Sequence, residues 1–206
     1  MSSLPTPCER IPTIPGVAVA CRPVIAGDED ALTMEENASL GDCVLAVRRR
    51  AAAARLAARE LLAEAGWPGW RMPRIDGQPP RWPAGICGSL SHSDTLAAAA
   101  LARRGAWLGV GIDLEPGEPI DRDVLDLIAT AEEARFVKHD LLIGKVLFCA
   151  KEAAYKAMFS VDKRFLEPHE IVVDLRSNTA TALSGRRAML AVHVDHRILV
   201  VGVVPG

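Results

Sequence analysis

Hydrophobic and polar residues follow helical and extended periods along the chain and divide it into segments. Residues 44–65 are mostly alanine, leucine and arginine, all strong helix formers, and predict a long helix that ends near Gly66. Apolar residues at helical spacing predict a helix over residues 123–138, and a second long helix follows over residues 141–158. Short apolar or alternating runs predict strands at residues 17–21, 96–102, 106–115, 171–175, 189–194 and 198–203, the first of them at a sheet edge.

The predicted strand at residues 106–115 has two different faces. Val110, Ile112 and Leu114 point to one side, and the residues between them point to the other. Asp113 and Glu115 therefore share a face, with roughly 6.5–7 Å between them along the strand. Taken alone, this pair has an equally good explanation as the solvated face of an ordinary strand.

The predicted helix at residues 141–158 adds a third carboxylate. Glu152 and Lys156 are four positions apart and share one face, which is also a common surface pair. If Glu152 meets Asp113 and Glu115, the three carboxylates form an all-oxygen site that suits Mg²⁺, an ion that keeps several waters and usually sits beside phosphates. Lys151 and Lys156 would then flank the ion, where a phosphate-bearing ligand needs positive charge.

Five arginines lie on the predicted helix at residues 44–65. Arg48, Arg55 and Arg59 fall near one face, whereas Arg49 and Arg50 turn away from it. Taken alone, the set is best explained by a basic, solvated face. The following residues, 66–94, are rich in glycine, proline and tryptophan, which predicts a structured loop with a turn at residues 76–77.

Composition narrows the class of protein. The chain has 206 residues, enough for one domain or two small ones, and half of them are hydrophobic, so it can bury a core. A net charge of −2 gives no sign of nucleic-acid binding. Five cysteines without a CxxC spacing argue for a reducing compartment and against a disulfide scaffold or a zinc site. With no signal-peptide pattern and no apolar run that could span a bilayer, we expect a soluble, cytoplasmic protein without a membrane partner.

Three motifs together resemble a known family. Gly111-Ile112-Asp113 is followed, 39 positions after Asp113 (152 − 113), by Glu152 within FCAKEAAYK at residues 148–156. This pairing resembles the core motifs of the 4′-phosphopantetheinyl transferase superfamily, GxD and, after a gap near forty, (F/W)(S/C/T)xKE(A/S)xxK. The stretch WPAGICGSLSH at residues 82–92 resembles the WPxGxxGSxSH block of the enterobactin-type and surfactin-type members.

The resemblance implies an architecture. Members of the monomeric type are α+β pseudo-dimers of two similar α/β modules, with the active site in the cleft between them. Here the modules would be residues 1–105, which dock coenzyme A, and residues 106–206, which carry the metal site and the catalytic helix. The chain length suits this type rather than the shorter, trimeric holo-(acyl-carrier-protein) synthase type, so we expect a monomer.

The resemblance also implies a reaction, the transfer of 4′-phosphopantetheine from coenzyme A to a serine of an acyl or peptidyl carrier protein, with release of 3′,5′-ADP. Asp113, Glu115 and Glu152 would hold Mg²⁺, or Mn²⁺ in its place. Lys156, with Lys151, would face the phosphates. The serine proton would go to a base, for which the candidates are Glu133 in a T-x-x-E step, Glu132 as the alternative, or a metal-bound water.

A further set of residues would contact the phosphates of coenzyme A in the family. Arg48 and Arg55 are the first choices for the 3′-phosphate, with Arg49 as the near alternative. Ser91 and His92 would contact the coenzyme A phosphates. Either Arg74 or Arg71 could supply another phosphate contact.

Two other functions remain open from the sequence. One is a coenzyme A or carrier-protein binding module without catalysis, and the other is a Mg²⁺-dependent phosphohydrolase that uses the same carboxylates. The sequence also leaves the carrier open among fatty-acid, polyketide and nonribosomal-peptide carriers, the last including those of siderophore pathways in secondary metabolism.

Overall fold

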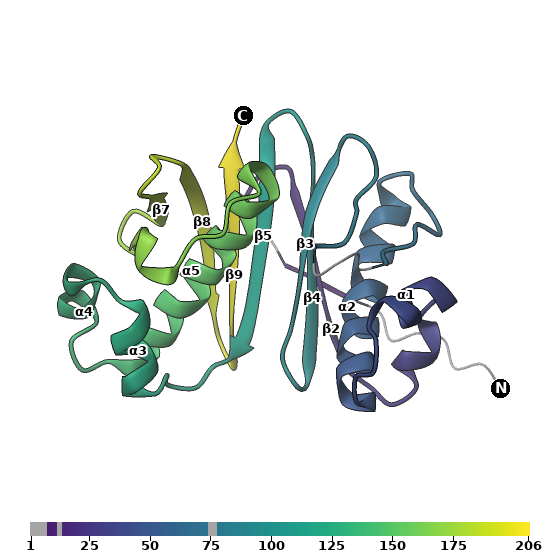
Figure 1. The fold of residues 1–206 in the computed structure, drawn as a ribbon, viewed down its shortest axis with the longest axis horizontal. Helices are drawn as coiled ribbons and strands as arrows, with labels where there is room; N and C mark the ends of the chain where they lie inside the picture. The colour runs from purple at the N-terminus through teal and green to yellow at the C-terminus, as the bar shows by residue number, and fades with distance from the viewer. Residues whose placement is uncertain (1–7, 12–13, 74–77) are drawn as a thin grey trace.

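Two antiparallel sheets stack face to face in the computed structural model, and a long helix covers the outer face of each (Figure 1). The structure describes residues 8–11, 14–73 and 78–206. The predicted α+β class with two modules of sheet and helix is confirmed. Arg74 and the predicted turn at residues 76–77 lie outside the described residues.

The first sheet has the strand order β1-β2-β4-β3. Its strands are β1 (Glu9–Arg10), β2 (Val17–Pro23), β3 (Ile86–His92) and β4 (Leu96–Arg103), and helix α2 (Leu45–Glu64) covers its outer face. Ala57 and Ala58 of α2 pack in one buried cluster with Ala99 of β4, and such short side chains let a helix lie close to a sheet. The strand predicted at a sheet edge is an inner strand, because β1 pairs with its outer side.

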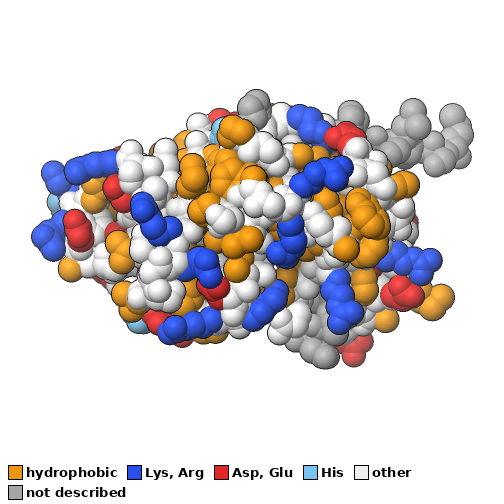
Figure 2. All heavy atoms as spheres, turned by 90° about the horizontal axis from the view of Figure 1, so that it is seen from above, with side chains coloured by type: hydrophobic (Ala, Val, Ile, Leu, Met, Phe, Trp, Pro, Cys, Tyr) orange, Lys and Arg blue, Asp and Glu red, His pale blue; other side chains and the backbone are white. Residues whose placement is uncertain are grey.

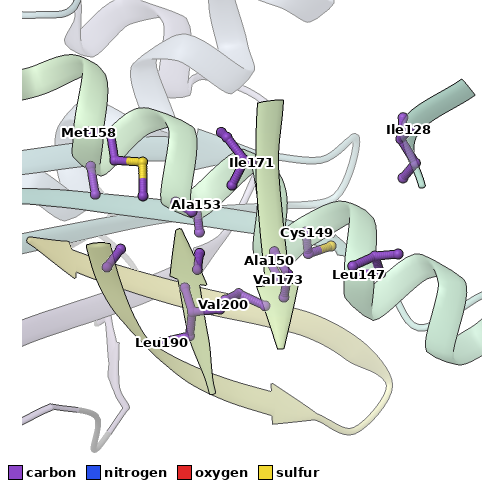
Figure 3. Close-up of a cluster of buried hydrophobic side chains, with 14 of the residues drawn as sticks. Ile128, Leu147, Cys149, Ala150, Ala153, Met158, Ile171, Val173, Leu190 and Val200 are labelled. Atoms are coloured by element: carbon purple, nitrogen blue, oxygen red, sulfur yellow. The ribbon is translucent and has the colours of Figure 1, made fainter. Parts of the chain in front are cut away.

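The second sheet has the strand order β5-β9-β8-β7-β6. Its strands are β5 (Trp107–Pro116), β6 (Ile171–Asp174), β7 (Thr179–Ala182), β8 (Arg187–Val194) and β9 (Arg197–Pro205). Helix α5 (Leu141–Asp162) covers the outer face, and Figure 3 shows Ala153 and Met158 of α5 in one buried cluster with Leu190 and Val200 of the strands. Strand β7 was not predicted, since its sequence TATA carries no large apolar residue.

Strand β5 lies unusually close to α5. A Cβ atom at Gly111 would be 2.0 Å from the Ala153 carbonyl oxygen, and one at Gly109 would be 2.3 Å from the Ala157 carbonyl oxygen. Only glycine leaves room for this approach of the two backbones. The glycine of the GxD motif is therefore required by strand–helix packing.

The opposite face of β5 forms the core between the two sheets. Val110, Ile112 and Leu114 are fully buried and share a cluster with Ala98 and Ala100 of β4. The predicted alternation along this strand is confirmed, because its apolar side chains face the first module and its acidic ones face α5. One strand thus joins the modules and carries the acidic residues.

The helix predicted at residues 123–138 is two short helices, α3 (Arg122–Ile128) and α4 (Ala131–Val137). Ala129 is extended, and the Thr130 side chain caps α4 by accepting a hydrogen bond from the Glu133 backbone. The Glu133 carboxylate accepts one from the Thr130 backbone in return, which completes a capping box. This capping chemistry starts a new helix where apolar spacing alone predicts a continuous one.

The remaining short helices are η1 (Asp28–Ala31), α1 (Met34–Ser39) and η2 (Pro168–Glu170). None of the helices in the described part of the chain combines the length and the apolar character needed to cross a membrane. In Figure 2, Lys and Arg side chains surround a central apolar area on the face seen from above, and acidic side chains are fewer there.

The contact between β5 and α5 gives a stability test. Gly111→Ala should lower the free energy of unfolding by about 1–3 kcal/mol or more, because its Cβ would overlap a backbone oxygen. Gly202→Ala is the matched control, since its Cβ would come only within 3.0 Å of the same Ala153 oxygen and should cost less. Urea denaturation measures both, and an equal effect of the two variants would contradict this account.

Candidate active site

A cleft of about 540 Å³ opens between the two modules. Helix α2 and strand β3 line it on one side, and β5 and α5 line it on the other. The polar and charged residues of its lining that matter most for function are Arg55, Ser91, His92, Asp113, Glu115 and Lys156. The structure therefore brings predicted phosphate-docking residues and two of the three predicted metal ligands to one cavity, whose described lining does not include Glu152.

Asp113 lies at the centre of this arrangement and is only 5% exposed. Its Oδ1 accepts hydrogen bonds from Lys156 Nζ at 2.7 Å and from Ser91 Oγ at 3.1 Å. Lys156 Nζ also donates to the Ile112 carbonyl oxygen at 3.0 Å, on the free edge of β5. The other carboxylate oxygen, Asp113 Oδ2, is buried and accepts no hydrogen bond of standard geometry from the described residues.

The other two predicted metal ligands lie near Asp113. Glu115 pairs with Lys145 at 2.9 Å. The pKa of Glu152 is raised, first by burial and then by the negative charges of Asp113 and Glu115, which together outweigh the opposing effect of Lys156. The pKa of the buried Cys149 thiol is raised by burial, by the charges of Asp113 and Glu115 and by a side-chain contact with Asp113. The three carboxylates are thus close enough to repel one another.

These carboxylates suit a divalent cation chemically, although no three acidic, histidine or cysteine side chains of the described residues are gathered at ligand distance. Lys145 and Lys156 neutralise two of the carboxylates and draw Glu115 and Asp113 toward themselves. The unpartnered Asp113 Oδ2 and the raised pKa of Glu152 both indicate oxygen atoms that a cation would stabilise.

Lys145 was not identified from the sequence. It lies seven residues before Glu152, two helical turns away, and so on the same face of α5. That spacing is the signal that could have revealed it.

The predicted arginines differ in where they lie. Arg55 lines the cleft and is buried, and it donates to the carbonyl oxygens of Met72 and Ala51, each at 3.0 Å. Arg48 instead bonds to Asn37 and donates to the Gly41 carbonyl oxygen at 2.7 Å, outside the described lining of the cleft.

The alternatives to Arg48 and Arg55 have acidic partners, and Arg55 itself lies 4.0 Å from the buried Glu36 carboxylate. Arg49 pairs with Glu29 at 2.8 Å, and Arg71 pairs with Glu35 at 3.3 Å on the surface. Arg55 is therefore the predicted arginine that the described structure places in the cleft.

His92 ends β3 and is exposed to the cleft. Its pKa is lowered, first by partial removal from water and then by the positive charges of Arg50, Lys156 and Arg55. At neutral pH the imidazole is therefore uncharged and can donate one hydrogen bond, while the nearby cations attract an anion.

Lys151 and Glu133 are not where the sequence predicted them. Their charged groups form a buried pair at 2.9 Å, and neither residue lines the cleft. Lys151 also donates to the Pro168 carbonyl oxygen at 2.9 Å, and Glu133 accepts from the Val173 amide at 2.7 Å. The two opposite charges neutralise each other, and the pair holds α4 and β6 against α5. The predictions that Lys151 faces the phosphates and that Glu133 faces the serine are therefore corrected.

Comparison with known proteins agrees with this geometry. A family model described as the 4′-phosphopantetheinyl transferase N-terminal domain matches residues 35–102, and one described as the 4′-phosphopantetheinyl transferase superfamily matches residues 109–202. The chain belongs to the 4′-phosphopantetheinyl transferase superfamily. The first match ends in β4 and the second begins in β5. Residues from both matched regions line the cleft.

Several curated members of the superfamily are similar to the chain. The 4′-phosphopantetheinyl transferase Npt of Nocardia iowensis is 36% identical over 141 residues, which is 67% of this chain and 64% of that protein. The 4′-phosphopantetheinyl transferase PptT of Mycobacterium tuberculosis is 40% identical over 113 residues, 53% of this chain and 50% of that protein. Enterobactin synthase component D of Escherichia coli is 37% identical over 95 residues, 43% of this chain and 44% of that protein. The matches therefore span 44% to 64% of these relatives' lengths.

The buried Lys151–Glu133 pair gives a test that separates a structural role from catalysis. Glu133→Ala leaves an uncompensated buried ammonium and should lower the free energy of unfolding by about 3–5 kcal/mol. Glu132→Ala changes the exposed neighbouring carboxylate and should cost less than about 1 kcal/mol. Urea denaturation measures both, and a Glu133→Ala variant of normal stability but reduced activity would restore Glu133 as the base.

Proposed function

We propose that this chain transfers the 4′-phosphopantetheine arm of coenzyme A to a serine hydroxyl of a carrier protein and releases 3′,5′-ADP. The observation that carries the proposal is the single cleft that holds Arg55 and His92 from one module and Asp113 and Lys156 from the other. An anionic nucleotide can contact the first pair while its diphosphate reaches the second. The motifs, the family and the names of the relatives support the same reaction.

The first module would dock the nucleotide end of coenzyme A. Arg55 supplies a permanent positive charge, and its side chain is fixed by two backbone carbonyl groups. His92 would donate a hydrogen bond to a phosphate oxygen from the exposed end of β3. Neither group takes part in bond breaking, so their effect is to fix the position of the diphosphate.

The second module would carry the chemistry. Asp113, Glu115 and Glu152 would hold Mg²⁺ or Mn²⁺, which when bound supplies charge neutralisation at the diphosphate. Lys156 would stabilise the negative charge that grows on the leaving 3′,5′-ADP phosphate.

The bond changes are simple to balance. The serine oxygen forms a bond to the phosphorus that carries the pantetheine arm, and the bond from that phosphorus to the bridging oxygen of the diphosphate breaks. The serine proton goes to a base, for which the candidates are a metal-bound water or the Glu152 carboxylate, which lies near Asp113 and Glu115. Glu133 is unavailable for this step because Lys151 holds it away from the cleft.

We infer that the carrier is an acyl or peptidyl carrier protein and that the enzyme acts as a cytoplasmic monomer. The WPxGxxGSxSH block fits both the enterobactin-type and the surfactin-type subclass, and the similarity to Enterobactin synthase component D adds a peptidyl carrier of siderophore assembly to the candidate carriers. The carriers to be tested as substrates also include polyketide, fatty-acid and other nonribosomal-peptide carriers.

The direct test is to incubate the purified protein with coenzyme A, Mg²⁺ and each member of a panel of these apo-carriers, and to measure the carrier's mass. A mass gain of one phosphopantetheine arm supports the proposal. If every carrier in the panel keeps its mass, the protein is a binding module without catalysis. Phosphate release without a carrier would indicate a phosphohydrolase.

Glu152→Ala should abolish transfer, with a fall in kcat of about 10³-fold, because a metal ligand and a candidate base are lost together. The control is Glu118→Ala, which removes an exposed carboxylate from the loop after β5. The carrier mass assay measures both rates. A folded Glu152→Ala protein that modifies the carrier at a near-normal rate would refute the assignment.

His92→Ala should raise KM for coenzyme A about tenfold and change kcat less, since the imidazole in the cleft would contact a phosphate that stays intact. His196→Ala, an exposed imidazole on the turn between β8 and β9, is the matched control. Steady-state kinetics at varied coenzyme A decides the point. A loss confined to kcat would place His92 in the chemistry instead.

A further inference from the structure

Ser91 connects the two modules at the cleft. It lies on β3 of the first module and is 8% exposed, yet its hydroxyl bonds to β5 of the second. Ser91 Oγ lies 3.1 Å from Asp113 Oδ1 and 3.2 Å from the Leu114 amide nitrogen. Lys156 Nζ lies further away, at 3.5 Å.

The partners determine where the hydroxyl proton points. An amide N–H and an ammonium group can only donate, and an ionised carboxylate can only accept. Ser91 must therefore accept from Leu114 and donate its one proton to Asp113. In this arrangement the Ser91 proton is used within the protein, on the Asp113 carboxylate.

This donation divides the work between the two oxygens of Asp113. Oδ1 accepts hydrogen bonds from Ser91 and Lys156, whereas Oδ2 accepts none of standard geometry in the part of the chain that the structure describes. The Cys149 thiol, a weak donor, also contacts the carboxylate. A carboxylate held at one oxygen by two donors on different elements has little freedom to rotate. Its second oxygen is thereby kept available as a ligand atom.

We propose that Ser91 is a positioning residue that holds Asp113 from across the module interface, so that Oδ2 is presented to a divalent cation. The inference rests on the metal assignment within the proposed function. Groups that orient a metal ligand by a hydrogen bond commonly change metal affinity 10–100-fold when they are removed. Because Ser91 belongs to the coenzyme A module, it also couples the packing of that module to the metal site.

The test measures Mn²⁺ binding by electron paramagnetic resonance of the free ion, with coenzyme A and carrier left out. Ser91→Ala should raise the Kd for Mn²⁺ about tenfold. Ser91→Thr keeps the hydroxyl and should restore most of the affinity. The matched control is Ser89→Ala, which removes a hydroxyl from the same strand and the same cleft lining and should leave Mn²⁺ binding unchanged.

The outcomes separate this inference from the proposed function. Wild-type protein that binds no Mn²⁺, or Ser91→Ala protein with wild-type affinity, overturns the positioning role even if transfer is intact. Ser91→Ala protein that shows only a raised KM for coenzyme A also overturns it and favours the phosphate contact. A tenfold loss of Mn²⁺ affinity with rescue by threonine supports it, even where a panel of carriers shows no transfer.

Discussion

The site depends on the close packing of β5 against α5. Without side chains at Gly109 and Gly111, the strand backbone lies directly against the helix backbone. This distance lets Lys156 reach both the Ile112 carbonyl oxygen and the Asp113 carboxylate. A larger residue in the strand would push α5 outward and draw the ammonium away from the acid, so a packing constraint sets the electrostatics of the cleft.

The same strand ties the site to the core of the molecule. On its other face, Ile112 and Leu114 are buried between the two sheets. Asp113 lies between these residues in the sequence and is itself nearly buried, which is costly for a charge unless it is paired and hydrogen-bonded. Lys156 from α5 and Ser91 from β3 offset that cost, so the carboxylate is stable only while both modules stay packed.

The sequence was most informative where chemistry and periodicity agree, and least where the partner of a residue depends on tertiary structure. Alternation in β5 correctly placed Asp113 opposite the apolar face. Adjacent helical positions lie about 100° apart, so Glu152 can lie near Asp113 and Glu115 while Lys151 faces the core. That Lys151 would meet Glu133 depends on the break before α4, which apolar spacing does not predict. The bond from Ser91 to Asp113 joins strands of different sheets, and no local pattern predicts such a contact.

The charges of the cleft explain why metal and substrate would bind together. The site carries three negative charges when Asp113, Glu115 and Glu152 are all ionised. It also carries two positive charges, on Lys145 and Lys156. The net value of −1 favours a divalent cation, and its arrival changes the sign to +1. Without the cation, the site would repel a diphosphate, because like charges in a partly buried cleft are weakly screened. With the cation bound, the same site would attract it. If Arg55 and His92 hold the 3′-phosphate, their attraction for it depends far less on this change of sign. The nucleotide end of coenzyme A can then dock before the diphosphate is stabilised.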